Sequence, residues 1–134
     1  MSRILERFHM LEKALDTFNV ALIKIKNITH EDYYYTEVRD SVIQRFEYSL
    51  DTFWKYCHHL LLVKYGIDVI SSPKVVFKNL LEIKVITIDD YKIIIEMIDD
   101  RNMTSHAYNV ELAEKISADL PKYYETIITL LKKL

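Results

Sequence analysis

The stretch ILERFHMLEKALDTFNVALIKI, residues 4–25, decides the fold class. Its large apolar side chains recur at alternating spacings of four and three: Ile4, Phe8, Leu11, Leu15, Phe18, Leu22 and Ile25. Residues three and four apart lie on one face of an α-helix, and here the charged side chains occupy the other positions. The narrow, heptad-like stripe predicts a helix that packs in an antiparallel bundle.

The composition extends this prediction to the whole chain. Half of the 134 residues are hydrophobic, and there are only one glycine and two prolines. A chain of this length usually forms one domain, and so few glycines and prolines favour long helices over hairpins and linkers. We therefore predict a single domain over residues 1–134, an all-α antiparallel bundle of about five helices.

Local signals place the other helices. The second runs from about Thr36 to Tyr65 and ends at Gly66, the third begins at Ser72-Pro73, and the fourth begins at a capping box, Thr87 to Asp90. The fourth helix should bury Tyr91, Ile94, Ile95 and Ile98. The fifth, from about Asn109, should bury Leu112, Ile116, Leu120, Tyr124, Ile127 and Leu131, with a kink or a break at Pro121.

Charge and cysteine content limit the functional classes. With 18 basic and 20 acidic residues the formal charge is −2, so no strong general attraction to nucleic acid or membrane is expected, although a local basic patch remains possible.

The lone Cys57, on the apolar face of the second helix, fits an inert buried thiol in a reducing compartment. No charge-free run approaches the ~20 residues of a membrane span. We expect a soluble cytoplasmic protein without membrane contact.

Chemistry-bearing side chains gather in DDRNMTSHAYNVE, residues 99–111. Arg101 and Ser105 continue the buried face of the fourth helix, whereas His106 would lie about 140° away on an unbroken helix. Arg101 and His106 could face one ligand only if the helix ended between them. Asn102, Thr104 and Ser105 favour such an ending, because their side chains compete for backbone hydrogen bonds.

This pattern of side chains suits the binding and cleavage of a phosphodiester. A guanidinium grips phosphate through paired hydrogen bonds, and histidine serves as a general acid or base near neutral pH. Arg101 and His106 could thus cleave RNA without a metal ion, with the 2′-hydroxyl as nucleophile, while the ring of Tyr108 could stack on a base. Alternatively, Arg101 pairs with Asp99, Asp100 or an acid on another helix, and His106 is a cap.

Other candidates are weaker. Glu6 and His9 have the spacing of a di-iron ligand pair, but no second copy exists, so no metal site is predicted. His58 and His59 point apart on a helix and make a poor chelate. Two further sets of residues keep two interpretations each. Arg39 and Arg45 either flank a binding cleft at the motif or form salt bridges. Tyr33, Tyr34 and Tyr35 either stack on a base or contact a partner, or they pack over a helix end.

The motif RNMTSHAY, residues 101–108, resembles the R-x4-H-x-Y signature of HEPN domains, specifically small toxins of the HepT type. DSVIQRFEYSLDTFWK (40–55) and SSPKVVFKNLLE (71–82) resemble successive blocks of the closely related nucleotidyltransferase substrate-binding proteins. The similarity covers most of the chain in the right order.

The resemblance implies a HEPN-type bundle that forms a homodimer, in which two motifs meet in one ribonuclease site. Arg101 would hold the phosphate, His106 would act as acid or base, Asn102 would shape the site, and Ser105 is a further supporting candidate. The expected partner is a minimal nucleotidyltransferase that neutralises the toxin by adding AMP to Tyr108. No cofactor is expected.

Two other functions stay open. The older family name implies a non-catalytic subunit that binds a nucleotide or another substrate and presents it to the nucleotidyltransferase. The third hypothesis is a purely structural bundle, in which the motif is only a corner between two helices. The chain is not itself the transferase, since it lacks the Gly-Ser and paired-aspartate pattern that such an enzyme needs for its metal ions.

Overall fold

The computed structural model describes residues 2–134, and within them it contains helices and no strand. The elements are α1 (Ser2–Lys26), α2 (Tyr35–Tyr65), α3 (Pro73–Glu82), α4 (Ile88–Met103), the short 3-10 turn η1 (Thr104–His106) and α5 (Val110–Leu131). The predicted all-α bundle of about five helices is confirmed. None of the described helices is both long and apolar enough to cross a membrane.

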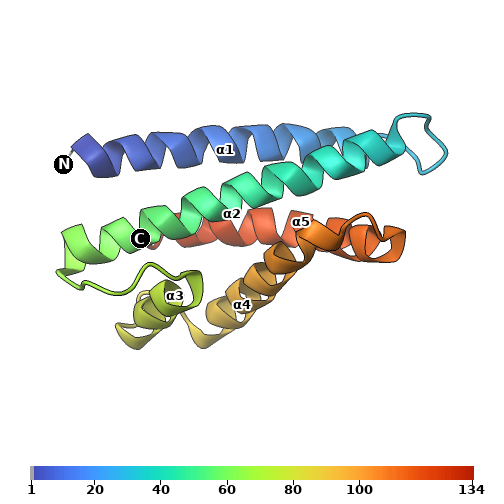
Figure 1. Ribbon diagram of the computed structural model, residues 1–134. Coiled ribbons are helices and arrows are strands. Elements are labelled where there is room, and N and C mark those ends of the chain that lie inside the picture. The colour runs from blue at the N-terminus through green and yellow to red at the C-terminus, as the bar shows by residue number, and fades with distance from the viewer. Residues whose placement is uncertain (1) are drawn as a thin grey trace.

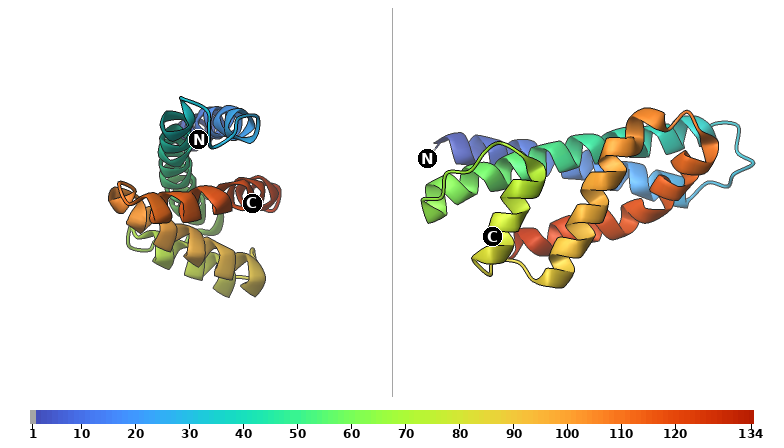
Figure 2. Two further views of the ribbon diagram at one scale, coloured as in Figure 1. Left: turned by 90° about the vertical axis from the view of Figure 1, so that its right-hand side faces the viewer. Right: turned by 60° about the horizontal axis from the view of Figure 1, so that its bottom comes forward.

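The two long helices, α1 and α2, run antiparallel and are joined by a loop over residues 27–34 (Figure 1). The fifth helix packs along α2 on the side away from most of α1. Helices α3 and α4 form a pair, in which α3 packs against α2 and α4 packs against both α5 and α2 (Figure 2). The end of α4 packs against α2. Arg101, the first residue of the motif 101–108, therefore contacts Glu47 and Asp51 near the middle of α2.

The helix ends follow from local chemistry. Thr87 Oγ1 accepts a hydrogen bond from the Asp90 amide at 3.1 Å, and Asp90 Oδ2 accepts one from the Thr87 amide at 3.0 Å, so the predicted capping box is confirmed. Gly66 ends α2 in the left-handed backbone region, with a φ of 67°, where a side chain would be strained. Pro73 occupies the first turn of α3, as predicted.

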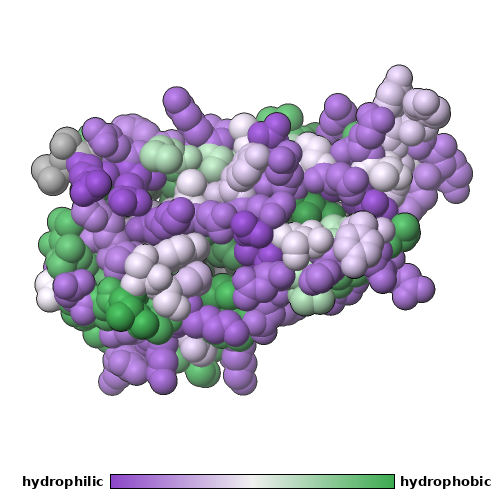
Figure 3. Space-filling view, in the orientation of Figure 1, coloured by the Kyte–Doolittle hydropathy of each residue, from purple (hydrophilic) through white to green (hydrophobic). Residues whose placement is uncertain are grey.

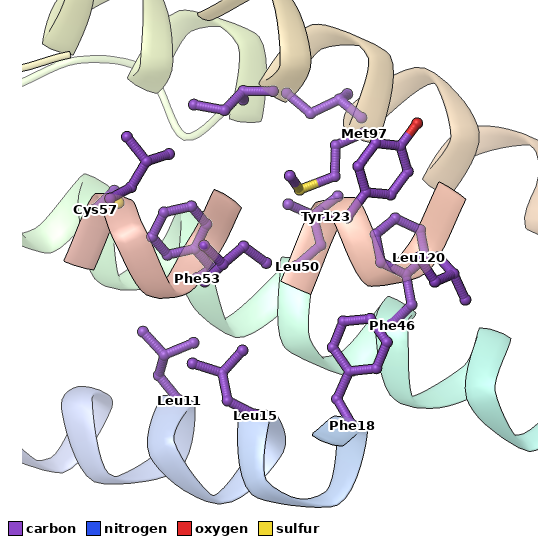
Figure 4. Close-up of a cluster of buried hydrophobic side chains, with 14 of the residues drawn as sticks. Leu11, Leu15, Phe18, Phe46, Leu50, Phe53, Cys57, Met97, Leu120 and Tyr123 are labelled. Atoms are coloured by element: carbon purple, nitrogen blue, oxygen red, sulfur yellow. The ribbon is translucent and has the colours of Figure 1, made fainter. Parts of the chain in front are cut away.

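The core lies between α1, α2 and α5 and extends to buried side chains of α3 and α4, among them Phe77 and Met97 (Figure 4). The ring of Phe46 is fully buried, with its centroid 6.1 Å from that of Phe18 and 5.5 Å from that of Tyr123. Cys57 is fully buried, as predicted, and this burial raises the pKa of its thiol.

The predicted face of α5 was partly wrong. Leu112, Tyr124 and Leu131 are only half-buried, and the most buried positions are Ala113, Ile116, Leu120, Tyr123, Ile127 and Leu130. The reason is that α5 packs against α2, α4 and α1 at once, so its apolar face is wider than one stripe. Pro121 lies inside α5 without dividing it. On α4, Ile94 and Ile98 are buried as predicted, but Tyr91 and Ile95 are half-buried.

Candidate functional site

The chain turns a corner between Arg101 and His106. Helix α4 ends at Met103, η1 follows, and Asn109 caps α5 by accepting a hydrogen bond from the Leu112 amide at 3.1 Å. The hydroxyl of Thr104 lies 2.8 Å from the carbonyl oxygen of Arg101, a local bond of the kind that ends helices. The predicted helix end between Arg101 and His106 is therefore confirmed.

Acids from α2 hold the guanidinium of Arg101. Its Nε and Nη2 donate to the two carboxylate oxygens of Asp51 at 3.2 and 3.0 Å. Its Nη1 lies 2.8 Å from Glu47 and 3.1 Å from the Thr104 hydroxyl. The hydrogen bond to Asp51 is the main reason that the pKa of Arg101 is raised, so the group stays charged. These contacts engage four of the five N–H groups that an arginine carries.

The sequence reasoning missed Asp51 and did not pair Glu47 with Arg101. The alternative that Arg101 pairs with an acid on another helix is the one that the structure bears out, and that helix is α2. Both acids are in the block 40–55 that carried the family resemblance, four residues apart and off the apolar stripe. That spacing puts them on one face of α2 and was the available signal.

The two acids that precede Arg101 have partners of their own. Asp99 accepts from Lys74 at 2.9 Å on the surface. Asp100 is buried and accepts from the Tyr123 hydroxyl at 2.6 Å and from Lys115 at 2.7 Å. Burial, and then the bond to Asp100, raises the pKa of Tyr123. The pair Asp100–Tyr123 fixes the end of α4 to α5 and leaves Arg101 directed at α2.

The other motif residues lie on the surface of the corner. His106 and Tyr108 are exposed, with ring centroids 6.1 Å apart in an edge-on arrangement, and Tyr108 is 83% exposed. Asn102 and Ser105 are exposed at a hollow of about 360 Å³, which Arg101 also lines. The other residues that line this hollow are Leu50, Asp51, Trp54, Pro73 and Ile98.

A second hollow of about 510 Å³ is lined in part by Glu47 and Thr104, which are hydrogen-bonded to each other. Tyr108 lines it, together with residues from the first half of α2 and from the start of α5. The structure therefore places Arg101, Asn102 and Ser105 at one hollow and Tyr108 at the other. His106 lines neither hollow.

A further polar cluster anchors the loop between α1 and α2. Glu114 accepts hydrogen bonds from His30 at 2.7 Å, from the Tyr35 hydroxyl at 2.8 Å and from Arg39 at 3.3 Å. Burial, and then the bond to Glu114, raises the pKa of Tyr35 to about 12. Arg39 is buried and also pairs with Asp40, so for Arg39 the salt-bridge alternative holds.

The fold and the site define a class, a small helical bundle with a charged corner between its last two helices. The chain belongs to the family described as "Nucleotidyltransferase substrate binding protein like", whose sequence profile matches residues 6–134.

The solved structures that are similar to this chain include the following two. A protein from Thermus thermophilus shares 33% identity with a TM-score of 0.79, over 92% of this chain and 98% of that chain. A chain in a crystal structure described as "the toxin-antitoxin with AMP-PNP" shares 15% identity with a TM-score of 0.69, over 92% and 96% of the two chains. At 15% identity the likeness concerns the fold alone. No curated protein matches the sequence.

Proposed function

We propose that this protein is the HEPN-family partner of a minimal nucleotidyltransferase and that its corner motif cleaves RNA without a metal ion. The observation that carries the proposal is the helix end between Arg101 and His106. Because the helix ends there, Arg101 and His106 need not point in the directions that an unbroken helix would impose, and Arg101 lines a hollow together with the polar side chains of Asn102 and Ser105.

In the proposed reaction Arg101 binds the scissile phosphate and His106 handles the protons. The ribose 2′-hydroxyl loses its proton to a histidine, and its oxygen forms a bond to phosphorus. The bond to the 5′-oxygen breaks, and that oxygen takes up a proton. The products are a 2′,3′-cyclic phosphate and a 5′-hydroxyl. Histidine suits both transfers because its pKa lies near neutrality.

A homodimer would place two such motifs in one site, so that one histidine acts as base and the other as acid. The surface around the motif supports self-association, since Met103, Tyr108 and Val110 are exposed. The same exposure of Tyr108 supports its proposed modification, because the partner enzyme has to reach the hydroxyl to transfer AMP to it.

The test is RNA cleavage in excess EDTA by the parent chain, His106→Ala and the control His9→Ala. His9 is exposed, and among the described residues its side chain forms a hydrogen bond only with Glu12 on its own helix. We expect cleavage by the parent and the control, and none by His106→Ala. Cleavage that EDTA abolishes, or that survives in His106→Ala, would contradict the proposed site.

A second function, a non-catalytic nucleotide-binding or substrate-binding subunit of the transferase, is favoured by one observation. The guanidinium of Arg101 donates hydrogen bonds to Asp51, Glu47 and Thr104, so few of its N–H groups remain to bind a phosphate. This alternative predicts a stable complex with the transferase and no RNA cleavage by an unmodified dimeric chain. The same assay therefore separates the two functions.

A further inference from the structure

A group of basic side chains lies beside the corner, where the start of α1 meets the second half of α2. Arg7 of α1 and Lys55 of α2 line one small hollow of about 90 Å³, together with Met10, Asp51 and Thr52. Because α1 and α2 run antiparallel, Arg3 and His59 lie one helical turn further along, on α1 and α2 respectively. We call Arg3, Arg7 and Lys55 the basic strip.

The pKa of His59 supports this placement. Burial lowers it first, and the positive charges of Arg7 and Arg3 lower it further. Both arginines therefore lie close enough to His59 to act on its charge. Hydrophilic side chains gather on the surface at this end of α1 (Figure 3).

The cations of the basic strip form no ion pair among the described residues. Within residues 2–134, none of Arg3, Arg7 and Lys55 lies within 4.0 Å of a carboxylate, in contrast to Arg39 and Arg101, which each pair with two acids. The Nε of Arg7 is also buried, and no residue in the part of the chain that the structure describes forms a hydrogen bond with it. A strip of unpaired cations in a chain of net charge −2 is a local excess of positive charge.

The basic strip is continuous with the motif. Asp51 lines both the small hollow of Arg7 and Lys55 and the larger hollow of Arg101. Trp54 lines the larger hollow, and the Lys55 Nζ lies 5.9 Å from the centre of its ring. The cations of α1 and α2, the ring of Trp54 and Arg101 of α4 are thus grouped around Asp51, whose carboxylate pairs with Arg101.

We propose that the basic strip binds the backbone phosphates of a single-stranded RNA segment whose neighbouring nucleotide reaches Arg101, with Trp54 as the stacking surface for a base. Cationic grooves that alternate with aromatic rings are the common means of binding single strands. An acidic protein surface would use the cations but not Trp54. The inference deepens the proposed function, since it rests on RNA being the ligand of this site.

The experiment measures the affinity of a short, labelled 2′-O-methyl oligonucleotide by fluorescence anisotropy over a range of salt concentrations. This probe lacks the 2′-hydroxyl nucleophile, so binding is measured without cleavage. The variant is Lys55→Glu, and the matched control is Lys24→Glu, an exposed lysine without an ion pair in the described chain, near the other end of α1.

We expect Lys55→Glu to weaken binding roughly tenfold and to reduce the slope of log affinity against log salt by about 0.7 to 1, one phosphate contact. Lys24→Glu should change neither quantity. Binding should also alter the emission of Trp54, the only tryptophan in the chain, in the parent and less so in Lys55→Glu. Thermal melting of both variants checks that they fold.

Three results would overturn the basic strip as an RNA-binding surface. They are equal effects of the two substitutions on oligonucleotide affinity, no effect of Lys55→Glu on that affinity, and no binding of the oligonucleotide by the parent. Cleavage of unmodified RNA by the parent is scored separately. Cleavage with equal oligonucleotide affinities for Lys55→Glu and Lys24→Glu would refute the strip and leave the ribonuclease proposal standing. Binding through Lys55 without cleavage would support the strip and refute the ribonuclease proposal.

Discussion

Arg101 and Asp51 form a two-point contact, with Nε 3.2 Å from Oδ1 and Nη2 3.0 Å from Oδ2. This is the geometry in which an arginine also grips a phosphate. In this arrangement the carboxylate occupies the edge of the guanidinium that the proposed substrate needs. A phosphate that binds through this edge has to displace Asp51.

Replacing the carboxylate should therefore favour a phosphate ligand. We expect Asp51→Asn to bind the 2′-O-methyl oligonucleotide more tightly than the parent, because Arg101 loses a charged competitor. The pair is partly exposed, so the loss of stability should be about 1 kcal/mol or less. Asp16→Asn, the same charge change on an exposed residue of α1, is the control. Weaker binding by Asp51→Asn alone would instead make Asp51 the residue that positions Arg101.

Tyr108 is the proposed site of AMP addition, and its exposure makes a simple prediction. Tyr108→Phe should still cleave RNA but should gain no AMP from the partner transferase, as measured by intact mass. Tyr33→Phe removes the hydroxyl of another highly exposed tyrosine and should be modified as the parent is. AMP found on Tyr108→Phe would place the modification elsewhere.

The Asp100–Tyr123 bond should contribute to stability, because it satisfies a buried carboxylate. Tyr123→Phe removes the donor 2.6 Å from Asp100 and should lower the free energy of unfolding by about 1–3 kcal/mol. Tyr124→Phe, on the neighbouring half-buried ring, is the control. Urea unfolding of both variants measures the difference, and equal losses would argue against the hydrogen bond as the cause.

The cluster around Glu114 predicts a dependence of stability on pH. Burial raises the pKa of Glu114, but hydrogen bonds from Tyr35, His30 and Arg39 outweigh it, so the pKa lies below the ordinary value of 4.5. A carboxyl group with a lowered pKa stabilises the fold above the unfolded value, and this contribution is lost as the pH falls through the folded value.

Glu114→Gln should therefore be less stable than the parent at neutral pH, and the difference should shrink as the pH falls below 4.5. Melting temperatures measured across this range test the sign. Glu125→Gln, an exposed position on the same helix, should show no such trend. A constant difference at every pH would mean that the charge of Glu114 does not matter.

Much of the fold could be predicted from local patterns. The apolar spacing of residues 4–25 predicted α1, the Thr87–Asp90 pattern predicted the start of α4, and Gly66 predicted the end of α2. Each of these signals depends on residues within one or two helical turns. The rotation of α5 was less predictable, since Tyr123 and Tyr124 are both apolar enough for burial and only the packing of several helices selects between them.

The sequence by itself determined the class of bundle, the helix end between Arg101 and His106, and the family to which the chain belongs, because these depend on neighbouring residues and on a motif. Only the tertiary structure decided what Arg101 contacts. Asp51 is 50 residues away along the chain, and no local pattern fixes how α2 is rotated against the end of α4. The packing of α5 against both helices fixes that rotation, and it thereby sets the competition between carboxylate and phosphate at the proposed site.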